Sequence, residues 1–243
     1  MIKELSWDSA FFKRKIGELN IAYGKPEQIE AALEKAKADG FAYIICKLTS
    51  KQTNVTARLE SSGFSLVDIG VTWAIETDRL ISKNMNGNPR IRKSVRIAVE
   101  KDIPRLKKIT TSIFEGSRFY RDPFFSKKEA DNLYNAWIEN SVKGRAADIV
   151  LCIQNKGFVT GKKIKGREGK IVLIGVKKGF NNKGIGTVLA EEALKWFLNE
   201  GVRIVSVRTQ LSNLSAMNFY LKLGCYIKDY DIVLSKNLLQ QYG

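Results

Sequence analysis

Two stretches in the second half of the chain have residue types suited to holding an anion and donating a proton. The first is the turn 181–187, N-N-K-G-I-G-T, which follows an apolar run and opens a helix-like pattern. Glycines at a helix N-terminus let backbone N–H groups approach a ligand, and the helix dipole favours negative charge there. A diphosphate suits this turn. It is neither a Walker loop nor a G-x-G-x-x-G fingerprint, so the turn alone also fits an ordinary strand-to-helix connection.

The second stretch begins at Asn213 and ends at Gly224, with the sequence N-L-S-A-M-N-F-Y-L-K-L-G. Asn is a favourable helix N-cap and Gly a common helix end, so a short helix carrying Tyr220 is predicted. A phenol with an ordinary pKa near 10 stays protonated at neutral pH and can protonate a thiolate whose ordinary pKa is about 8.5. Tyr220 equally fits an aromatic side chain packed on the core.

Hydrophobic periodicity places both stretches between strands and helices. Around them we expect strands at 171–176, 203–209 and 226–234 and helices at 185–198 and 213–224. Upstream we expect strands at 92–99, 148–154 and 158–163 and helices at 104–113 and 127–142. The two stretches therefore follow successive strands of one predicted sheet.

In this order and at this separation, the two stretches resemble the GNAT superfamily of N-acetyltransferases. The family signature is [QR]-x-x-G-x-[GA] after one strand and N-x-x-A-x-x-x-Y-x-x-x-G after the next. The resemblance extends from about residue 91 to the C-terminus, and Asn181 stands where the family has Gln or Arg. It implies an α/β (α+β) GNAT acetyltransferase fold with a mixed central sheet.

The resemblance also implies the chemistry: direct attack of a primary amine on acetyl-CoA, used as a co-substrate, with no metal. It assigns the general-acid role to Tyr220 and a backbone contact to the thioester oxygen or pantetheine to Gly175 or Val176. The residues it implies for acetyl-CoA binding are Ile174, Gly175, Val176, Asn181, Asn182, Lys183, Gly184, Ile185, Gly186, Thr187 and Asn213.

Residues 1–78 are predicted to form a smaller α/β domain. A helix, Gly63 and a strand echo the later order around Gly224, and Leu59 then stands where Tyr220 stands. The segment has no glycine turn, so we interpret it as a degenerate GNAT-like half; a coincidental helix–Gly–strand unit fits equally well. The polar stretch 79–90 is the predicted linker, and 91–243 the predicted catalytic domain.

The acceptor is suggested by a narrower resemblance. The stretch 117–125, S-R-F-Y-R-D-P-F-F, and the opening W-D-S-A-F-F resemble bacterial members of the family that acetylate dTDP-linked amino-dideoxy sugars. This implies a nucleotide-linked amino sugar as partner, a role in cell-surface polysaccharide biosynthesis, and a possible homodimer. Arg118 and Arg121 then hold a diphosphate and Tyr120 stacks on a base or sugar. That these three residues belong to a solvated loop without a ligand is an equally good interpretation.

Charge is unevenly distributed along the chain. Residues 1–90 carry 13 Lys and Arg against 11 Asp and Glu, whereas residues 91–243 carry 28 against 14. Basic surface favours anionic partners, and two diphosphate ligands account for it without nucleic acid. Two alternatives stay open: a GNAT enzyme acting on a protein N-terminus, lysine or polyamine, and a basic nucleic-acid-binding module.

Composition excludes several other classes. Histidine is absent, which removes His-based triads and His-ligated zinc sites. Three cysteines without C-x-x-C spacing predict buried thiols rather than a metal site or disulfides. No apolar run reaches the length of a membrane span and no signal peptide is indicated, so we expect a cytoplasmic protein.

Overall fold

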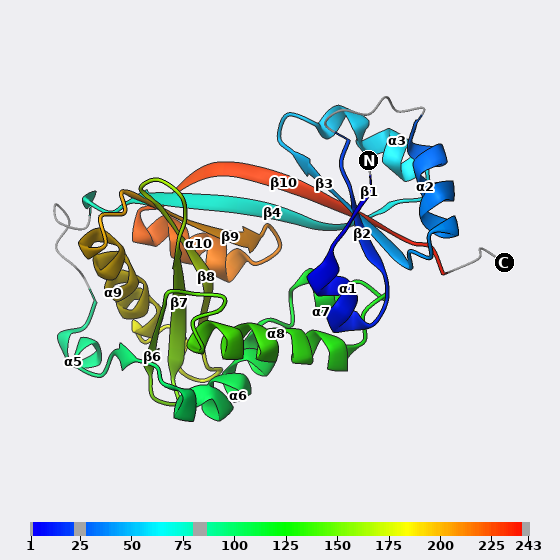
Figure 1. Ribbon diagram of the computed structural model, residues 1–243. Coiled ribbons are helices and arrows are strands. Elements are labelled where there is room, and N and C mark those ends of the chain that lie inside the picture. Colours follow the sequence, from blue (N-terminus) through cyan, green and yellow to red (C-terminus); the bar gives the residue numbers. More distant parts are fainter. Residues whose placement is uncertain (1, 22–27, 80–86, 240–243) are drawn as a thin grey trace.

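The computed structural model describes residues 2–21, 28–79 and 87–239, and in these residues the strands form one ten-stranded mixed sheet (Figure 1). The strand order is β1-β2-β3-β10-β4-β9-β8-β7-β6-β5. No helix in this part of the chain is long and apolar enough to span a membrane. The strands are β1 (Ile2–Glu4), β2 (Ile16–Leu19), β3 (Tyr43–Thr49), β4 (Ser65–Glu76), β5 (Arg96–Ile97), β6 (Ile149–Ile153), β7 (Gly157–Lys163), β8 (Glu168–Val176), β9 (Ile204–Gln210) and β10 (Tyr226–Asn237).

Helices connect the strands and cover the sheet. They are α1 (Ser6–Phe12), α2 (Gln28–Ala38), α3 (Thr56–Ser61), α5 (Pro89–Arg92), α6 (Ile103–Ile113), α7 (Arg118–Arg121), α8 (Lys127–Val142), α9 (Ile185–Asn199) and α10 (Leu214–Leu223), with short 3-10 turns at Thr53–Val55 and Glu100–Asp102.

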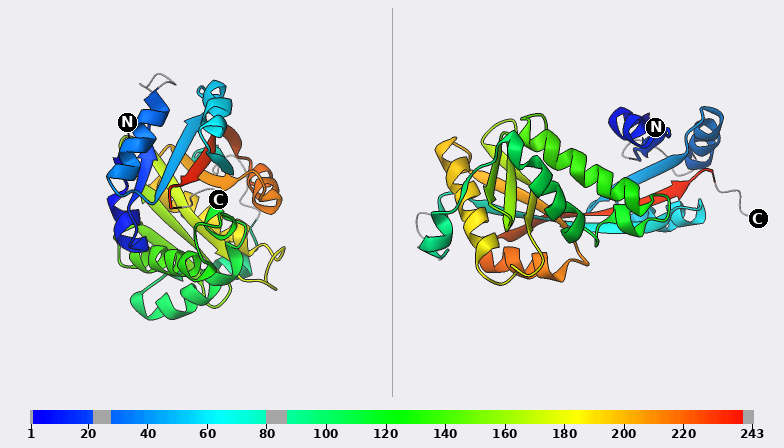
Figure 2. Two further views of the ribbon diagram at one scale, coloured as in Figure 1. Left: turned by 90° about the vertical axis from the view of Figure 1, so that its right-hand side faces the viewer. Right: turned by 90° about the horizontal axis from the view of Figure 1, so that it is seen from below.

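Successive residues of a strand pack in two different hydrophobic cores, because their side chains point to opposite faces of the sheet. On β6, Ile149 and Leu151 pack with α9 and α10, whereas Val150 and Cys152 pack with α6 and α8. The sheet therefore lies between α6–α8 and α9–α10, as the views of Figure 2 also show. The helices on the two faces of the sheet are therefore packed in two separate hydrophobic cores.

The two long strands β4 and β10 connect the N-terminal half of the chain (β1–β4) to the C-terminal half (β5–β10). Each of them pairs with strands of the other half. β10, from the end of the chain, pairs with β3 and β4, and β4 pairs with both β10 and β9. Each half therefore contributes its last strand to a position beside a strand of the other half. On both outer flanks a parallel pair follows, β2 with β3 and β8 with β9, so the N-terminal segment repeats the strand order of the second half.

β8 and β9 pair only at their beginnings. Their parallel register runs from Glu168 opposite Ile204 to Ile171 opposite Val207 and ends there, although both strands continue. A register shift against β7 lies at the same place, because Thr160 faces Leu173 while Gly161 faces Ile171. The bulge and the end of pairing separate the two strands and open a gap in the sheet.

The predicted strand at 92–99 was wrong over its first half. Asn88 accepts a hydrogen bond from the Arg90 N–H (2.9 Å) and Pro89 fixes the first helical position, so residues 89–92 form α5. The strand shortens to Arg96–Ile97. Most of the predicted linker lies outside the described residues, and the domain boundaries stay a prediction, although one sheet runs through both segments.

Candidate active site

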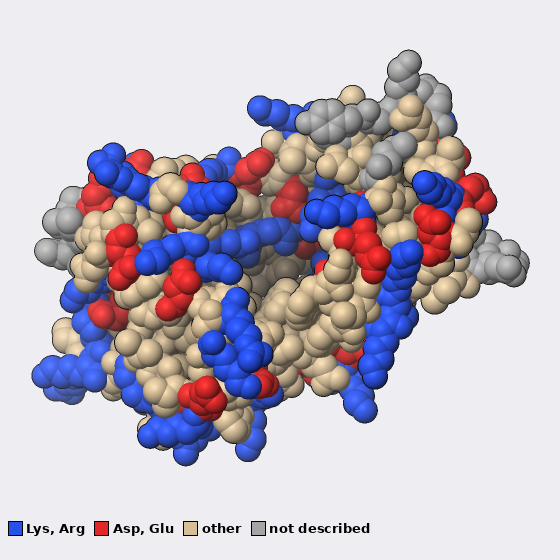
Figure 3. Space-filling model, viewed as in Figure 1, with Lys and Arg blue, Asp and Glu red and all other residues tan. Residues whose placement is uncertain are grey.

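A groove of about 1610 Å³ follows the gap between β8 and β9 and reaches the N-terminal half. It opens between the two halves in Figure 3, where Lys and Arg side chains cross it and stand at its rim. Most of the predicted site residues line it, from both sides of the sheet. They are Arg118, Ile174, Gly175, Val176, Asn181, Asn182, Gly184, Gly186, Thr187, Asn213 and Tyr220.

The first turn of α9 presents free backbone donors to this groove. Gly184 is the N-cap in the left-handed region (φ 76°), where glycine avoids a steric penalty. No side chain caps the helix, and the Val188 N–H is the first that donates to a carbonyl of the turn, that of Gly184 (3.1 Å). The N–H groups of residues 185–187 thus have no intrahelical acceptor.

Lys183 and Ile185 do not line the groove with their side chains. The Lys183 ammonium lies 5.3 Å from the centre of the Phe180 ring, and Ile185 is buried in the core. Their contribution to this end of the groove is backbone, as expected for an anion bound at a helix N-terminus.

The β8 edge offers two further backbone donors. Gly175 faces Phe158 on β7, and the Lys177 N–H donates to the Lys156 carbonyl (2.8 Å). Hydrogen-bonded and non-hydrogen-bonded pairs alternate in an antiparallel ladder. In this register the N–H and C=O of Gly175 therefore point toward β7. The N–H and C=O of Ile174 and Val176 point toward the gap.

Tyr220 reaches the groove from the α10 side of the sheet. Its side chain is 3% exposed, and its ring centre lies 6.2 Å from that of Trp73. Burial raises the pKa of the Tyr220 hydroxyl, because the phenolate is poorly solvated there. Asn213 caps α10 by accepting from the Ala216 N–H (3.1 Å), and Gly224 ends the helix.

A partly buried ion triad forms part of the groove wall and was missed from the sequence. Arg208 on β9 donates to Asp231 on β10 (2.7 and 2.6 Å) and to Asp68 on β4 (3.1 Å). Its guanidinium passes directly over Gly70, where a Cβ would lie 2.0 Å from it. Beside the triad, burial and Arg208 lower the pKa of Lys170. The one sequence signal was a glycine inside a strand.

The three residues predicted for acceptor binding are placed differently from one another. Arg118 lines the groove with its guanidinium 4.2 Å from the Phe119 ring centre, and Arg121 lines a separate cavity. Tyr120 lines neither: it stacks on Tyr134 and donates to Asp131 (2.5 Å). The Ser117 hydroxyl is buried in the groove wall beside Tyr134.

Two acidic residues, one after α7 and one at the start of β8, are engaged in other contacts. Asp122 is buried and accepts from the Tyr43 hydroxyl, the Phe124 N–H and Ser235. Glu168 is exposed at the start of β8, 3.4 Å from the Lys228 ammonium, and does not line the groove. Neither is placed to take a proton in the groove.

Comparison with known proteins agrees with this geometry. Residues 112–225 match the Acetyltransferase (GNAT) family. The chain is 25% identical over 232 residues to the dTDP-fucosamine acetyltransferase of Escherichia coli O6:H1, covering 93% of this chain and 94% of that protein. It is 26% identical over 125 residues to the spore coat polysaccharide biosynthesis protein SpsD of Bacillus subtilis (strain 168), covering 51% of this chain and 43% of that protein.

Solved structures show the same fold. A tandem GNAT protein from the clavulanic acid biosynthesis pathway superimposes with a TM-score of 0.59 at 12% identity, over 93% of this chain and 76% of that one. A functionally unknown protein from Staphylococcus epidermidis ATCC 12228 superimposes with a TM-score of 0.62 at 15% identity, over 92% and 84%. The GNAT fold prediction is confirmed, including the repeated arrangement of strands.

Proposed function

We propose that this chain, an acyl-CoA-dependent N-acetyltransferase whose residues 112–225 match the GNAT family, acetylates the primary amine of a nucleotide-linked amino-dideoxy sugar. The resemblance to the dTDP-fucosamine acetyltransferase carries this proposal, because it spans 93% of the chain rather than the GNAT domain alone. The SpsD relative, named for polysaccharide biosynthesis, supports a role for the product in a cell-surface polysaccharide.

The groove suits acetyl-CoA along its length. The free N–H groups of residues 185–187 receive the CoA diphosphate, and the open β8 edge pairs with the pantetheine amides. Ile174 and Val176 both face the gap, so one N–H is available for pantetheine and another for the thioester oxygen, where negative charge develops. Gly175 is excluded from that role because it bonds β7. Nothing in this arrangement calls for a metal.

Transfer then proceeds in one displacement. The neutral amine attacks the thioester carbon, the C–S bond breaks as the amide C–N bond forms, and the thiolate takes a proton from Tyr220. Because its pKa is raised, the Tyr220 hydroxyl is protonated at neutral pH and can donate its proton when negative charge develops on the sulfur. The amine approaches from the face that carries Lys170 and Arg208, opposite α10, and water receives its proton.

The N-terminal half takes part in the acceptor end of the groove. Asp8 on α1 and Lys47 on β3 line it together with Arg118 and Lys170. Burial raises the pKa of Asp8, with Arg118 and Lys47 opposing this. A wall that carries both acidic and basic side chains suits an acceptor with both an amine and phosphates. A polyamine carries no phosphate and fits this wall less well.

The test is thiol release from acetyl-CoA against dTDP- and UDP-linked amino-dideoxy sugars, with a polyamine and a lysine peptide as controls. We expect turnover with a nucleotide sugar and none with either control. Turnover with the polyamine or the peptide and with none of the nucleotide sugars would refute the proposed acceptor. Salt-dependent binding to any polyanion without acetyl transfer would favour the nucleic-acid alternative.

A further inference from the structure

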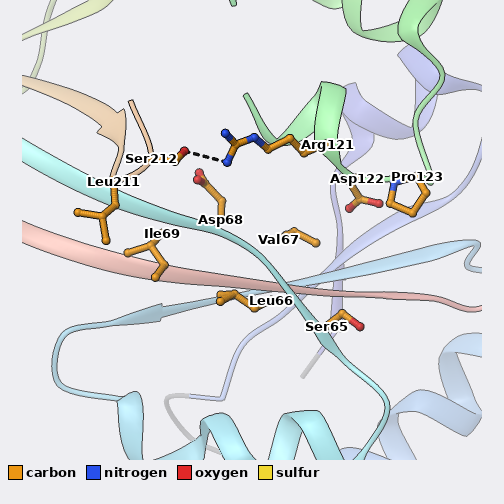
Figure 4. Close-up of a pocket in the computed structure, with 10 residues that line it drawn as sticks. All are labelled: Ser65, Leu66, Val67, Asp68, Ile69, Arg121, Asp122, Pro123, Leu211 and Ser212. Carbon is orange, nitrogen blue, oxygen red and sulfur yellow. Dashed lines mark hydrogen bonds between the residues drawn. The ribbon is translucent and has the colours of Figure 1, made fainter. Parts of the chain in front are cut away.

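A second cavity of about 550 Å³ lies next to the groove and shares a lining residue with it. Residues 65–69 of β4, the end of α7 with the following loop (121–123) and the turn 211–212 line it, and Figure 4 shows the side chains of these three segments. Asp68 lines both this cavity and the groove, so the two meet at this residue. Its volume falls in the range of small-ligand sites, about 300–1,000 Å³.

The cavity lies against an open strand edge. β9 pairs with β4 only as far as Gly70, after which the Leu211 N–H donates to the Ile69 carbonyl (2.8 Å). Beyond that point β4 pairs with β10 alone, and there Val233 faces Asp68 while Leu234 faces Leu66. This shift leaves Val67 without a register partner on β10, and β9 does not extend to it, so this edge of β4 is open here. A planar base can form donor and acceptor bonds with such an edge.

Arg121 stands at the border of the cavity with hydrogen-bonding capacity to spare. It is exposed, and its Nη1 donates to the Ser212 hydroxyl (2.8 Å), which leaves other N–H groups for phosphate oxygens. The two carboxylates of the cavity are already engaged, Asp68 by Arg208 and Asp122 by the Tyr43 hydroxyl and the Phe124 N–H. Side chains of Leu66, Pro123 and Leu211 supply apolar surface.

We propose that this cavity binds the nucleoside of the acceptor, with the base against the open edge of β4 and the diphosphate on Arg121. The sugar then enters the groove past Asp68, which directs its amine toward the gap where Tyr220 lies. This assignment rests on the proposed function and gives the base a place other than Tyr120, whose ring and hydroxyl are occupied.

The first test measures dTDP binding by calorimetry with the whole chain saturated with CoA, so that the α9 site is filled. We expect dTDP to bind one site, and Arg121→Ala and Leu66→Trp each to weaken it about tenfold or more, about 1.4 kcal/mol. Leu66 is 51% exposed, so tryptophan fits without disturbing the core. Arg105→Ala, an exposed arginine on α6 outside both cavities, is the matched control and leaves dTDP binding unchanged.

Equal dTDP affinity in wild type and both variants overturns the assignment, as does absence of dTDP binding to the CoA-saturated protein. Turnover separates this from failure of the proposed function. If the wild type acetylates a nucleotide sugar and both variants keep its KM, the cavity assignment fails and the function stands. If no nucleotide sugar is acetylated while acetyl-CoA still binds, the proposed function itself fails.

Discussion

At the scale of single residues, the site combines side chains that the sequence marks with others that it does not. Tyr220, Asn213 and the glycine turn were predicted because each belongs to a short stretch with its own local spacing pattern. Arg208, Asp68 and Asp231 were not, because they come together only through the pairing of β9, β4 and β10. Local spacing cannot report a contact that depends on strand order.

Replacing Tyr220 tests its assignment as the general acid. Tyr220→Phe removes one hydroxyl and keeps the ring against Trp73, so we expect kcat to fall by about tenfold or more with little change in acetyl-CoA affinity. Steady-state thiol release and direct acetyl-CoA titration measure the two effects. Unchanged turnover would show that another group protonates the thiolate.

The pH dependence follows from the direction of the Tyr220 pKa shift. Burial disfavours the phenolate and so raises the pKa, which keeps the acid protonated beyond the ordinary value of about 10. Activity should therefore rise as the acceptor amine loses its proton and show no loss from Tyr220 up to about pH 10. A descending limb centred below about pH 9 in the wild type, absent in Tyr220→Phe, would contradict this.

At the scale of elements, the function depends on where α9 begins and where β8 leaves β9. The start of α9 was predicted closely, since the apolar periodicity changes at the turn and α9 begins at Ile185. The gap itself was not visible in the sequence, because it arises from a bulge and a short register. By contrast, local capping by Asn88 overrode the strand-like pattern at 89–92.

Gly184→Ala tests the first turn of α9. A non-glycine residue at φ 76° costs about 1–2 kcal/mol and displaces the following N–H groups, so we expect CoA affinity to fall by about tenfold. Gly201→Ala is the matched control, since Gly201 also has a positive φ (74°) and open space around it but lies outside the groove. Both variants should lose similar stability in thermal unfolding. Equal CoA affinity for both would mean that the turn does not bind the diphosphate.

At the scale of the whole molecule, the exchange of β4 and β10 makes the two halves interdependent. The sequence indicated a repeated unit and a degenerate first half, and the structure adds that each half completes the sheet of the other. Such pairing joins residues more than 120 positions apart, so no local pattern predicts it. The end of the groove proposed for the acceptor has walls from both halves.

This interdependence predicts the behaviour of fragments. Residues 87–243 expressed alone should be unstable, because β9 and β10 lose the strand that lies between them. Co-expression with residues 1–79 should restore a complex that copurifies and binds acetyl-CoA. Full-length protein cut between residues 79 and 87 is the control and should stay associated. A stable, acetyl-CoA-binding fragment 87–243 would show that β4 is dispensable.

The reaction product tests the central claim most directly. Acetyl-CoA labelled with ¹³C at the carbonyl is incubated with a dTDP-linked amino-dideoxy sugar, and the product is examined by NMR. The account predicts a labelled amide carbonyl coupled to an N–H on the carbon that carried the amine, with the nucleotide still attached. A labelled ester, or labelled free acetate with the amine unmodified, would contradict it.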